Sequence, residues 1–207
     1  MENVKIRWLG HACFKMEYRG WSLVIDPYQD GSVSGLPPLR ESAGAVFCSH
    51  GHGDHNAAEN VKVSRIAPPD DFSVETIEGP HDHHGGRRRG KNTIHIFRFG
   101  DTRVVHMGDV GCMPPEETLR RIRGCEVLLL PIGGYYTVDE REAYEIAEAV
   151  KPRCTAPMHY RGNGFGFDVL GTVIPFAARF ADAKWLAAPE FEVYENGPVG
   201  LVIPALI

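Results

Sequence analysis

The chain has 207 residues, of which 43% are hydrophobic and 24% are charged, and its formal net charge is −5. A chain of this length can bury one core, so we expect a single domain over residues 1–207. The acidic balance disfavours bulk electrostatic binding to nucleic acid or to an anionic membrane. The expected partner is therefore a small molecule.

The N-terminal segment and the cysteines indicate the compartment. Residues 1–14 lack a basic stretch followed by an apolar segment, and no run approaches the length that spans a bilayer. Scattered cysteines without a C-x-x-C pair are typical of buried thiols in a reducing compartment. They are Cys13, Cys48, Cys112, Cys125 and Cys154. We expect a cytoplasmic protein without a membrane segment.

Strand patterns begin the chain and recur along it. Val4, Ile6 and Trp8 alternate on one face of the segment 4–9. Similar runs at 13–18 and 21–26 extend this into a predicted antiparallel meander. Further apolar runs predict a buried strand at 45–49 and strands at 93–99, 103–107, 126–131, 154–158, 191–195 and 200–204, with a turn at 196–198.

Two helix patterns lie between the later strands. Over residues 137–152, Thr137 is the expected N-cap, Glu140 follows three residues later, and Pro152 is the expected stop. A shorter helix is expected within 114–124. Many strands with interspersed helices, and no βαβ repeat at the N-terminus, predict two sheets packed face to face with helices outside.

The six residues 50–55, HGHGDH, predict a metal site. They follow an apolar run, and His50, His52, Asp54 and His55 supply the imidazole and carboxylate groups that suit zinc, iron or manganese. The two intervening glycines would let the chain curl around an ion, because glycine tolerates positive φ and close backbone approach.

This pattern after a buried strand resembles the signature of the metallo-β-lactamase superfamily of binuclear hydrolases. The segments WLGHACFKMEYRGWSLVIDPY, RGKNTI, HMGDVG, PIGGYYTVD and PMHY, in this order between residues 8 and 160, are similar to its branch of ascorbate-6-phosphate lactonase-like proteins. The resemblance implies an α/β (α+β) fold, a four-layer αββα sandwich of two mixed β-sheets packed face to face with helices outside.

The resemblance also implies sites for two divalent metal ions. The implied ligands are His50, His52 and His81 for the first ion, Asp54, His55 and His159 for the second, and Asp109 bridging both. Zinc is the first expectation, with manganese or iron as alternatives.

Other histidines leave alternatives open. His83 and His84 follow His81 closely and could replace it as a ligand or contact the substrate. His11, in the GHACF turn, would either line the cavity or support a ligand. A structural role is the better interpretation for two histidines inside strand runs, His95 and His106.

Metal-assisted hydrolysis is the reaction class that such a site predicts. Two ions would lower the pKa of a shared water from about 15.7 towards 7, so the predicted nucleophile is a metal-bridging hydroxide. Asp54 or Asp109 would orient it or accept its proton, and His159 completes the predicted catalytic set. No G-x-S-x-G segment offers a competing nucleophile. The expected substrate is a small anionic ester, lactone or phosphodiester.

The polar loop 79–92, GPHDHHGGRRRGKN, is long enough to be functional. Arg87, Arg88, Arg89 or Lys91 could hold a phosphate or carboxylate, or could form a solvated basic surface. Two alternative functions are a metal-binding sensor or partner module without catalysis and a nuclease, which the acidic net charge disfavours. The apolar, glycine-rich segment 164–176 could be a lid, a core segment or an interface, so a homo-oligomer is an option.

Overall fold

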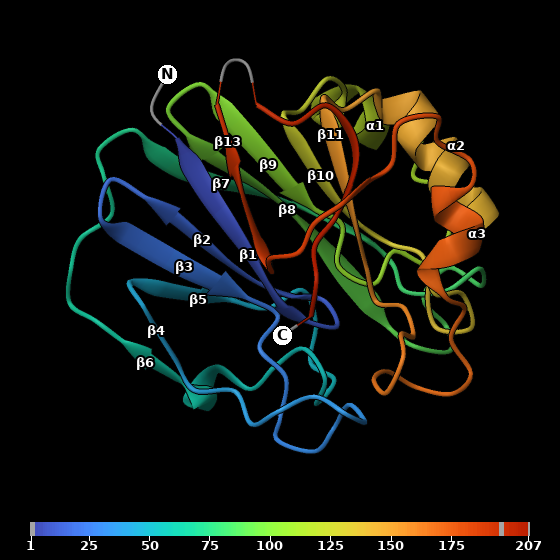
Figure 1. The fold of residues 1–207 in the computed structure, drawn as a ribbon, viewed down its shortest axis with the longest axis horizontal. Coiled ribbons are helices and arrows are strands. Elements are labelled where there is room, and N and C mark those ends of the chain that lie inside the picture. Colours follow the sequence, from blue (N-terminus) through green and yellow to red (C-terminus); the bar gives the residue numbers. More distant parts are fainter. Residues whose placement is uncertain (1–2, 195–196, 207) are drawn as a thin grey trace.

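Two mixed β-sheets form the body of the molecule (Figure 1). The computed structural model describes residues 3–194 and 197–206, so residues 195 and 196, expected in a strand and a turn, lie outside the described residues. The five-stranded sheet has the order β13 (Glu190–Val193), β1 (Val4–Gly10), β2 (Cys13–Tyr18), β3 (Trp21–Ile25) and β5 (Ala45–Phe47). The seven-stranded sheet has the order β12 (Lys184–Trp185), β14 (Gly200–Ile203), β11 (Cys154–Met158), β10 (Val127–Pro131), β9 (Thr102–His106), β8 (Lys91–Phe99) and β7 (Phe72–Pro80).

The five-stranded sheet contains the predicted meander. β1, β2 and β3 pair antiparallel, and β5 joins the far side of β3 in parallel. The expectation of a fully buried strand at 45–49 was wrong, because all three residues of β5 are only half-buried. β5 lies at the edge of its sheet, where one long side of the strand has no neighbour in that sheet.

The seven-stranded sheet contains two strands that the sequence did not predict, β7 and the two-residue β12. β9, β10, β11 and β14 run parallel, whereas β7 and β8 form an antiparallel hairpin. Ile77 is the one buried residue of β7, so this edge strand lacks the apolar run that marks the others. Its pairing continues to Pro80 opposite Lys91, so the polar connection covers residues 81–90 and is shorter than the predicted loop.

Aromatic side chains join the inner faces of the two sheets. Trp21 of β3 lies 4.6 Å from Phe72 of β7, measured between ring centroids, and Tyr18 of β2 lies 5.6 Å from Phe99 of β8. Both contacts cross from one sheet to the other within a continuous buried core. The predicted fold class of two mixed sheets packed face to face is therefore confirmed.

The layers outside the two sheets differ. The helices α1 (Glu116–Ile122), α2 (Glu140–Val150) and α3 (Val173–Ala177) lie together on one side, where α2 contacts β10 (Figure 1). On the opposite side, β4 (Glu41–Ala43) and β6 (Val61–Val63) form a short parallel pair next to the 3-10 turn η1 (Ala58–Asn60). Among the described residues, the second outer layer thus contains this pair in place of an α-helix.

The N-cap of α2 is Asp139 and not the predicted Thr137. Asp139 Oδ1 accepts hydrogen bonds from the backbone N–H groups of Arg141 and Glu142, and Glu142 Oε2 accepts from the N–H of Asp139. This is a complete capping box. The hydroxyl of Thr137 instead donates to the carbonyl of Val138, so it cannot cap the helix.

The described part of the chain contains no helix that is both long and apolar enough to cross a membrane. All five cysteines are free thiols, and Cys13, Cys125 and Cys154 are buried.

Candidate metal centre and active site

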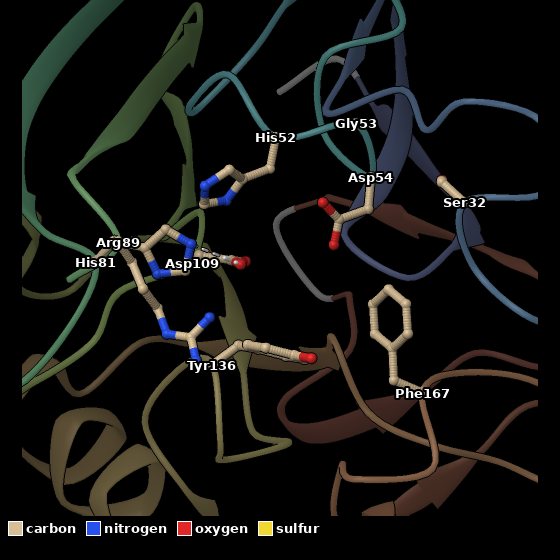
Figure 2. Close-up of a pocket in the computed structure, with 9 residues that line it drawn as sticks. All are labelled: Ser32, His52, Gly53, Asp54, His81, Arg89, Asp109, Tyr136 and Phe167. Atoms are coloured by element: carbon tan, nitrogen blue, oxygen red, sulfur yellow. Dashed lines mark ion pairs between the residues drawn. The ribbon is translucent and has the colours of Figure 1, made fainter.

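The segments that follow β5, β9 and β11 meet the β7–β8 connection at one end of the two sheets. Figure 2 shows His52, Asp54, His81 and Asp109 around a common centre, and His159, which follows β11, lies against Asp109. The structure brings together all seven predicted ligands, which are His50, His52, Asp54, His55, His81, Asp109 and His159. The convergence follows from topology, because the carboxyl ends of parallel strands meet at the same edge of a sheet.

Asp109 lies at the centre of this cluster. Its Oδ2 atom lies 3.1 Å from His159 Nε2, 3.3 Å from His55 Nε2, 3.3 Å from His81 Nε2 and 3.9 Å from His50 Nε2. Burial alone would raise the pKa of Asp109, but the neighbouring imidazoles hold it well below its usual range. One carboxylate oxygen therefore lies near ring nitrogens of four histidines that come from three segments of the chain.

The cluster contains buried polar atoms without hydrogen-bond partners. Within the described residues these include His50 Nε2, His55 Nε2, His159 Nε2 and Asp109 Oδ1. Folded proteins leave few such atoms unpaired, and each needs a reason. Imidazole nitrogens and carboxylate oxygens are ligands of divalent metals, so this His/Asp cluster is able to bind metal.

The donor atoms form three groups whose members lie within 4.8 Å of one another, and one of them, His50, His55 and Asp109, shares a histidine with each of the other two. The other two groups are His50, His52 and His81, and His11, Asp54, His55 and His159. This division is the one that the resemblance implied, with His11 added. The assignment of individual ligands to individual ions stays a prediction.

His11 contacts two other members of the second group, Asp54 and His159. Its Nε2 lies 3.2 Å from Asp54 Oδ2, and its ring centroid lies 4.0 Å from that of His159. Its carbonyl accepts the backbone N–H of His159, which ties the β1–β2 turn to the end of β11. Burial and the neighbouring His159 lower the pKa of His11 to about 3. Of the two predicted roles, this geometry favours support of a ligand.

Asp26, which the sequence analysis did not single out, orients two of the histidines. Its Oδ2 lies 2.8 Å from His55 Nδ1 and accepts from the hydroxyl of Ser49 at 2.6 Å. Ser49 Oγ in turn lies 2.9 Å from His50 Nδ1. Because both Nδ1 atoms have hydrogen-bond partners, the Nε2 atoms of His50 and His55 face the cluster. Hydrogen-bond partners behind metal-binding histidines commonly orient the rings in this way.

Two further histidines lie in the seven-stranded sheet. His106 Nε2 donates to the carbonyl of Ala12, and its Nδ1 accepts the backbone N–H of Gly108, so its predicted structural role is confirmed. His95 is buried and its ring stacks on Phe97 at 5.6 Å between centroids. Neither belongs to the groups of potential metal ligands.

Gly108 allows the close approach that places Asp109. Asn92 accepts the backbone N–H of Asp109 at 2.8 Å and donates to the carbonyl of Met107 at 2.8 Å. Gly108 has φ 54°, and a Cβ there would lie 2.1 Å from Asn92 Oδ1 and 2.7 Å from Ser49 Cβ. Only glycine fits this position without a shift of its neighbours.

We expect Gly108→Ala to lower metal affinity by about tenfold or more, as loss of a partner behind a metal ligand does. Gly20→Ala is the matched control, because Gly20 also has positive φ but an added Cβ would meet nothing within 4 Å. The control should show only the cost of the left-handed backbone, about 1–2 kcal/mol in unfolding free energy. Competition with a chelating dye measures the metal affinity, and denaturant unfolding measures the unfolding free energy. Equal effects of the two substitutions would contradict the role of Gly108.

A cavity of about 350 Å³ lies over the cluster. It is lined by Ser32, His52, Gly53, Asp54, His81, Arg89, Asp109, Tyr136 and Phe167. In Figure 2, Arg89 and Tyr136 lie on one side of the cavity, and Ser32 and Phe167 lie on the other. The sequence alone did not indicate Ser32, Tyr136 or Phe167 as residues of this cavity.

Most of the predicted substrate contacts lie away from this cavity. Arg87, Arg88 and His84 are exposed and do not line it, and Lys91 pairs with Glu78 at 3.0 Å. His83 lines a smaller cavity of about 220 Å³ that Arg89 also borders, and its Nε2 lies 3.6 Å from Glu142. Of the three alternatives in this loop, His81 is the one brought to the cluster.

Asp82 organises the connection that bears His81 and Arg89. Its carboxylate accepts four backbone N–H groups, from His84 at 2.7 Å, Gly86 at 3.0 Å, Arg88 at 2.9 Å and Arg89 at 2.8 Å. Burial would raise the pKa of Asp82, but these donors lower it to about 2. The loop is therefore held by a side chain that stays ionised at neutral pH.

Asp82→Ala should increase the amide hydrogen-exchange rates of residues 84–89 by about tenfold or more, since about 1.4 kcal/mol of lost hydrogen bonding corresponds to a tenfold change. Asp70→Ala, in the turn before β7, is the control and should leave these rates unchanged. Mass spectrometry of exchanged peptides measures the effect. Unchanged protection in Asp82→Ala would show that other contacts hold the loop.

The sequence is similar to known protein families. The profile of the beta-lactamase superfamily domain matches residues 5–159. The chain belongs to the metallo-beta-lactamase superfamily. Among its relatives in the superfamily is a UPF0173 protein of Pyrococcus abyssi, 32% identical over 192 residues, with 79% of this chain and 86% of the relative covered. A UPF0173 metal-dependent hydrolase of Thermoplasma acidophilum is 30% identical over 190 residues, with 77% and 84% covered.

A solved member of the superfamily supports the same placement. The crystal structure of a candidate Zn-dependent hydrolase of the metallo-beta-lactamase superfamily from Thermotoga maritima matches with a TM-score of 0.75 at 28% sequence identity. The match covers 97% of this chain and 98% of that one. The predicted superfamily is therefore confirmed, and the narrower resemblance to the lactonase-like branch stays a prediction.

Proposed function

We propose that this superfamily member is a hydrolase that uses two divalent metal ions. The observation that carries the proposal is the position of Asp109, whose Oδ2 lies 3.3 Å from His81 in one group and 3.1 Å from His159 in the other. A carboxylate between two sets of imidazoles is suited to bridge two ions. The relatives that are named metal-dependent hydrolases support the same proposal.

When bound, the two ions would supply hydroxide from water at neutral pH and polarise the scissile bond. The chain contributes the proton acceptor and the walls. Asp54 lines the cavity, and its Oδ2 is fixed by His11 at 3.2 Å, so this carboxylate is placed to orient water or to accept its proton. His159 is fully buried and does not line the cavity, so its proposed role is to hold metal. Asp54 and Asp109 line the cavity, where a substrate or water would contact them.

The proposed substrate is a small anionic ester, lactone or phosphodiester. A cavity of about 350 Å³ suits a small molecule, and Arg89 and Phe167 offer it one cationic and one apolar contact. A nuclease is disfavoured, because the net charge is −5 and Arg87, Arg88 and Lys91 do not line the cavity. Zinc remains the first expectation for the ions, with manganese or iron as alternatives.

Elemental analysis and turnover of an ester, lactone and phosphodiester panel test the proposal together. We expect about two ions per chain after metal-replete preparation, with activity lost to a chelator and restored by metal. The double variant His50→Ala, His52→Ala should lose metal, and His84→Ala, which is exposed, is its control. Full metal content without any turnover would favour the sensor function. Less than one ion per chain would contradict both functions.

A further inference from the structure

Arg89 is a fixed cation in the wall of the cavity. Its backbone N–H donates to Asp82 at 2.8 Å, which anchors the residue at the base of its side chain. Its guanidinium carbon lies 4.4 Å from the ring centroid of Tyr136 and 5.8 Å from that of Tyr135. Stacking of this kind holds a guanidinium plane against an aromatic face and leaves its N–H edge free.

The guanidinium of Arg89 forms no ion pair within the described residues. Its neighbour Lys91 pairs with Glu78 at 3.0 Å, and Arg179 on the helical side pairs with Glu140 at 3.5 Å. Among the described residues no carboxylate lies within ion-pair distance of the Arg89 guanidinium, although Asp82, Asp139 and Glu142 line the smaller cavity that Arg89 also borders. A guanidinium without a partner that borders a cavity is suited to bind a planar pair of oxygen atoms from a ligand.

Arg89 borders the same cavity as the His/Asp cluster but lies beside the cluster, so bond cleavage and ligand binding can take place at different positions in one cavity. Figure 2 shows its guanidinium between His81 and Tyr136, beside the cluster and across the cavity from Phe167. A bond cleaved at the cluster would leave another part of the same molecule against Arg89. Phe167 would then cover an apolar part of it on the opposite side.

We propose that Arg89, stacked on Tyr136, forms a subsite for a carboxylate or phosphate group that the substrate bears in addition to the bond that is cleaved. This inference rests on the proposed hydrolase function and deepens it. Carboxylate and phosphate share the pair of oxygen atoms that a guanidinium binds with two hydrogen bonds. The substrate class is thus an ester, lactone or phosphodiester with a separate anionic substituent.

The test compares Arg89→Met with Arg88→Met in the metal-replete protein. Arg88 is the matched control, because it belongs to the same basic run and its side chain is exposed. The assay uses three versions of one ester: neutral, with a carboxylate substituent and with a phosphate substituent. We expect Arg89→Met to lower the ratio of kcat/KM for an anionic over the neutral version by about 10- to 100-fold, the usual range for a lost charge-assisted hydrogen bond. Arg88→Met should leave the ratio unchanged.

The phosphate and carboxylate arms show which anion the subsite takes, and Arg89→Lys should restore the ratio only in part, because an ammonium lacks the fork. Unchanged ratios in Arg89→Met would overturn the proposal, provided that metal content and unfolding midpoint match those of the parent protein. If no ester is hydrolysed, the hydrolase function fails while the subsite is still tested by calorimetric titration with inorganic phosphate. In that titration, about tenfold weaker binding by Arg89→Met than by Arg88→Met supports the subsite, and equal binding overturns it.

Discussion

Asp109→Ala is expected to remove bound metal and to lower kcat/KM by more than about 100-fold, since partners behind metal ligands alone typically contribute 10- to 100-fold. Asp109 is itself the central member of the cluster, with Oδ2 3.1 Å from His159 and 3.3 Å from both His55 and His81. Without Asp109, the two groups of histidines no longer share a carboxylate. Both groups should therefore bind metal less tightly, and not only one of them.

Asp101→Ala is the matched control for this substitution. Asp101 is an exposed aspartate in the turn between β8 and β9, at the opposite end of β9 from Asp109. We expect the control to retain its metal and its activity. Elemental analysis after dialysis and steady-state turnover measure the two variants side by side. If Asp109→Ala kept about two ions per chain, Asp109 would not be a bridging ligand.

The strands that the sequence predicted are those with continuous or alternating apolar residues. β2 and β11 have the predicted bounds, because both are buried along most of their length. β7 was missed, because its outward residues face solvent and Ile77 alone is buried. The cap of α2 was misplaced by two residues, because Thr137 and Asp139 both precede a glutamate three residues later and only the structure shows which side chain faces the helix.

For the site too, residues that are close in sequence could be predicted from the local pattern, whereas residues that are distant in sequence could not. The four predicted ligands in residues 50–55 are close together in sequence, so the loop alone indicated a metal site. His81, Asp109 and His159 follow three different strands, and only the resemblance connected them to that loop. Their convergence depends on the order of β7, β9 and β11 in the sheet, which the sequence does not state locally.

Two residues of the site, Arg89 and Asp26, could not be singled out from the sequence. Arg87, Arg88 and Arg89 are equivalent in sequence, and the structure distinguishes them because Arg89 alone lines the cavity. Asp26 ends a predicted strand and has no ligand spacing, yet its hydrogen bonds reach Ser49 and His55, which are 23 and 29 residues away. Such roles arise from packing between segments and are visible only when the segments are placed.

Asp26→Ala is expected to lower both the stability of the fold and its affinity for metal. The carboxylate accepts from Ser49 N at 2.6 Å, Ser49 Oγ at 2.6 Å and His55 Nδ1 at 2.8 Å, and all three residues are buried. Each buried donor left without a partner costs about 1–3 kcal/mol, so unfolding free energy should fall by about 3 kcal/mol or more. Metal affinity should fall by about 10- to 100-fold, since His50 and His55 lose their orientation.

Asp182→Ala is the control for the loss of an aspartate, because Asp182 is exposed and belongs to neither the site nor the core. It should leave both the unfolding midpoint and the metal affinity unchanged. Denaturant unfolding of the metal-free protein separates the stability effect from the loss of bound ions. Metal affinity that stays unchanged in Asp26→Ala would contradict the orienting role.

Asp26→Asn distinguishes orientation from simple packing. The amide keeps an oxygen for Ser49 N, but an NH₂ group replaces Oδ2 and faces His55 Nδ1. Nδ1 must then accept a hydrogen bond, which places the ring proton on Nε2, the atom that faces the cluster. Asp26→Asn should therefore retain more of the unfolding free energy than Asp26→Ala and still lose metal affinity, because a protonated Nε2 cannot bind an ion. Equal recovery of stability and metal affinity in Asp26→Asn would show that Asp26 fills space and does not select the tautomer of His55.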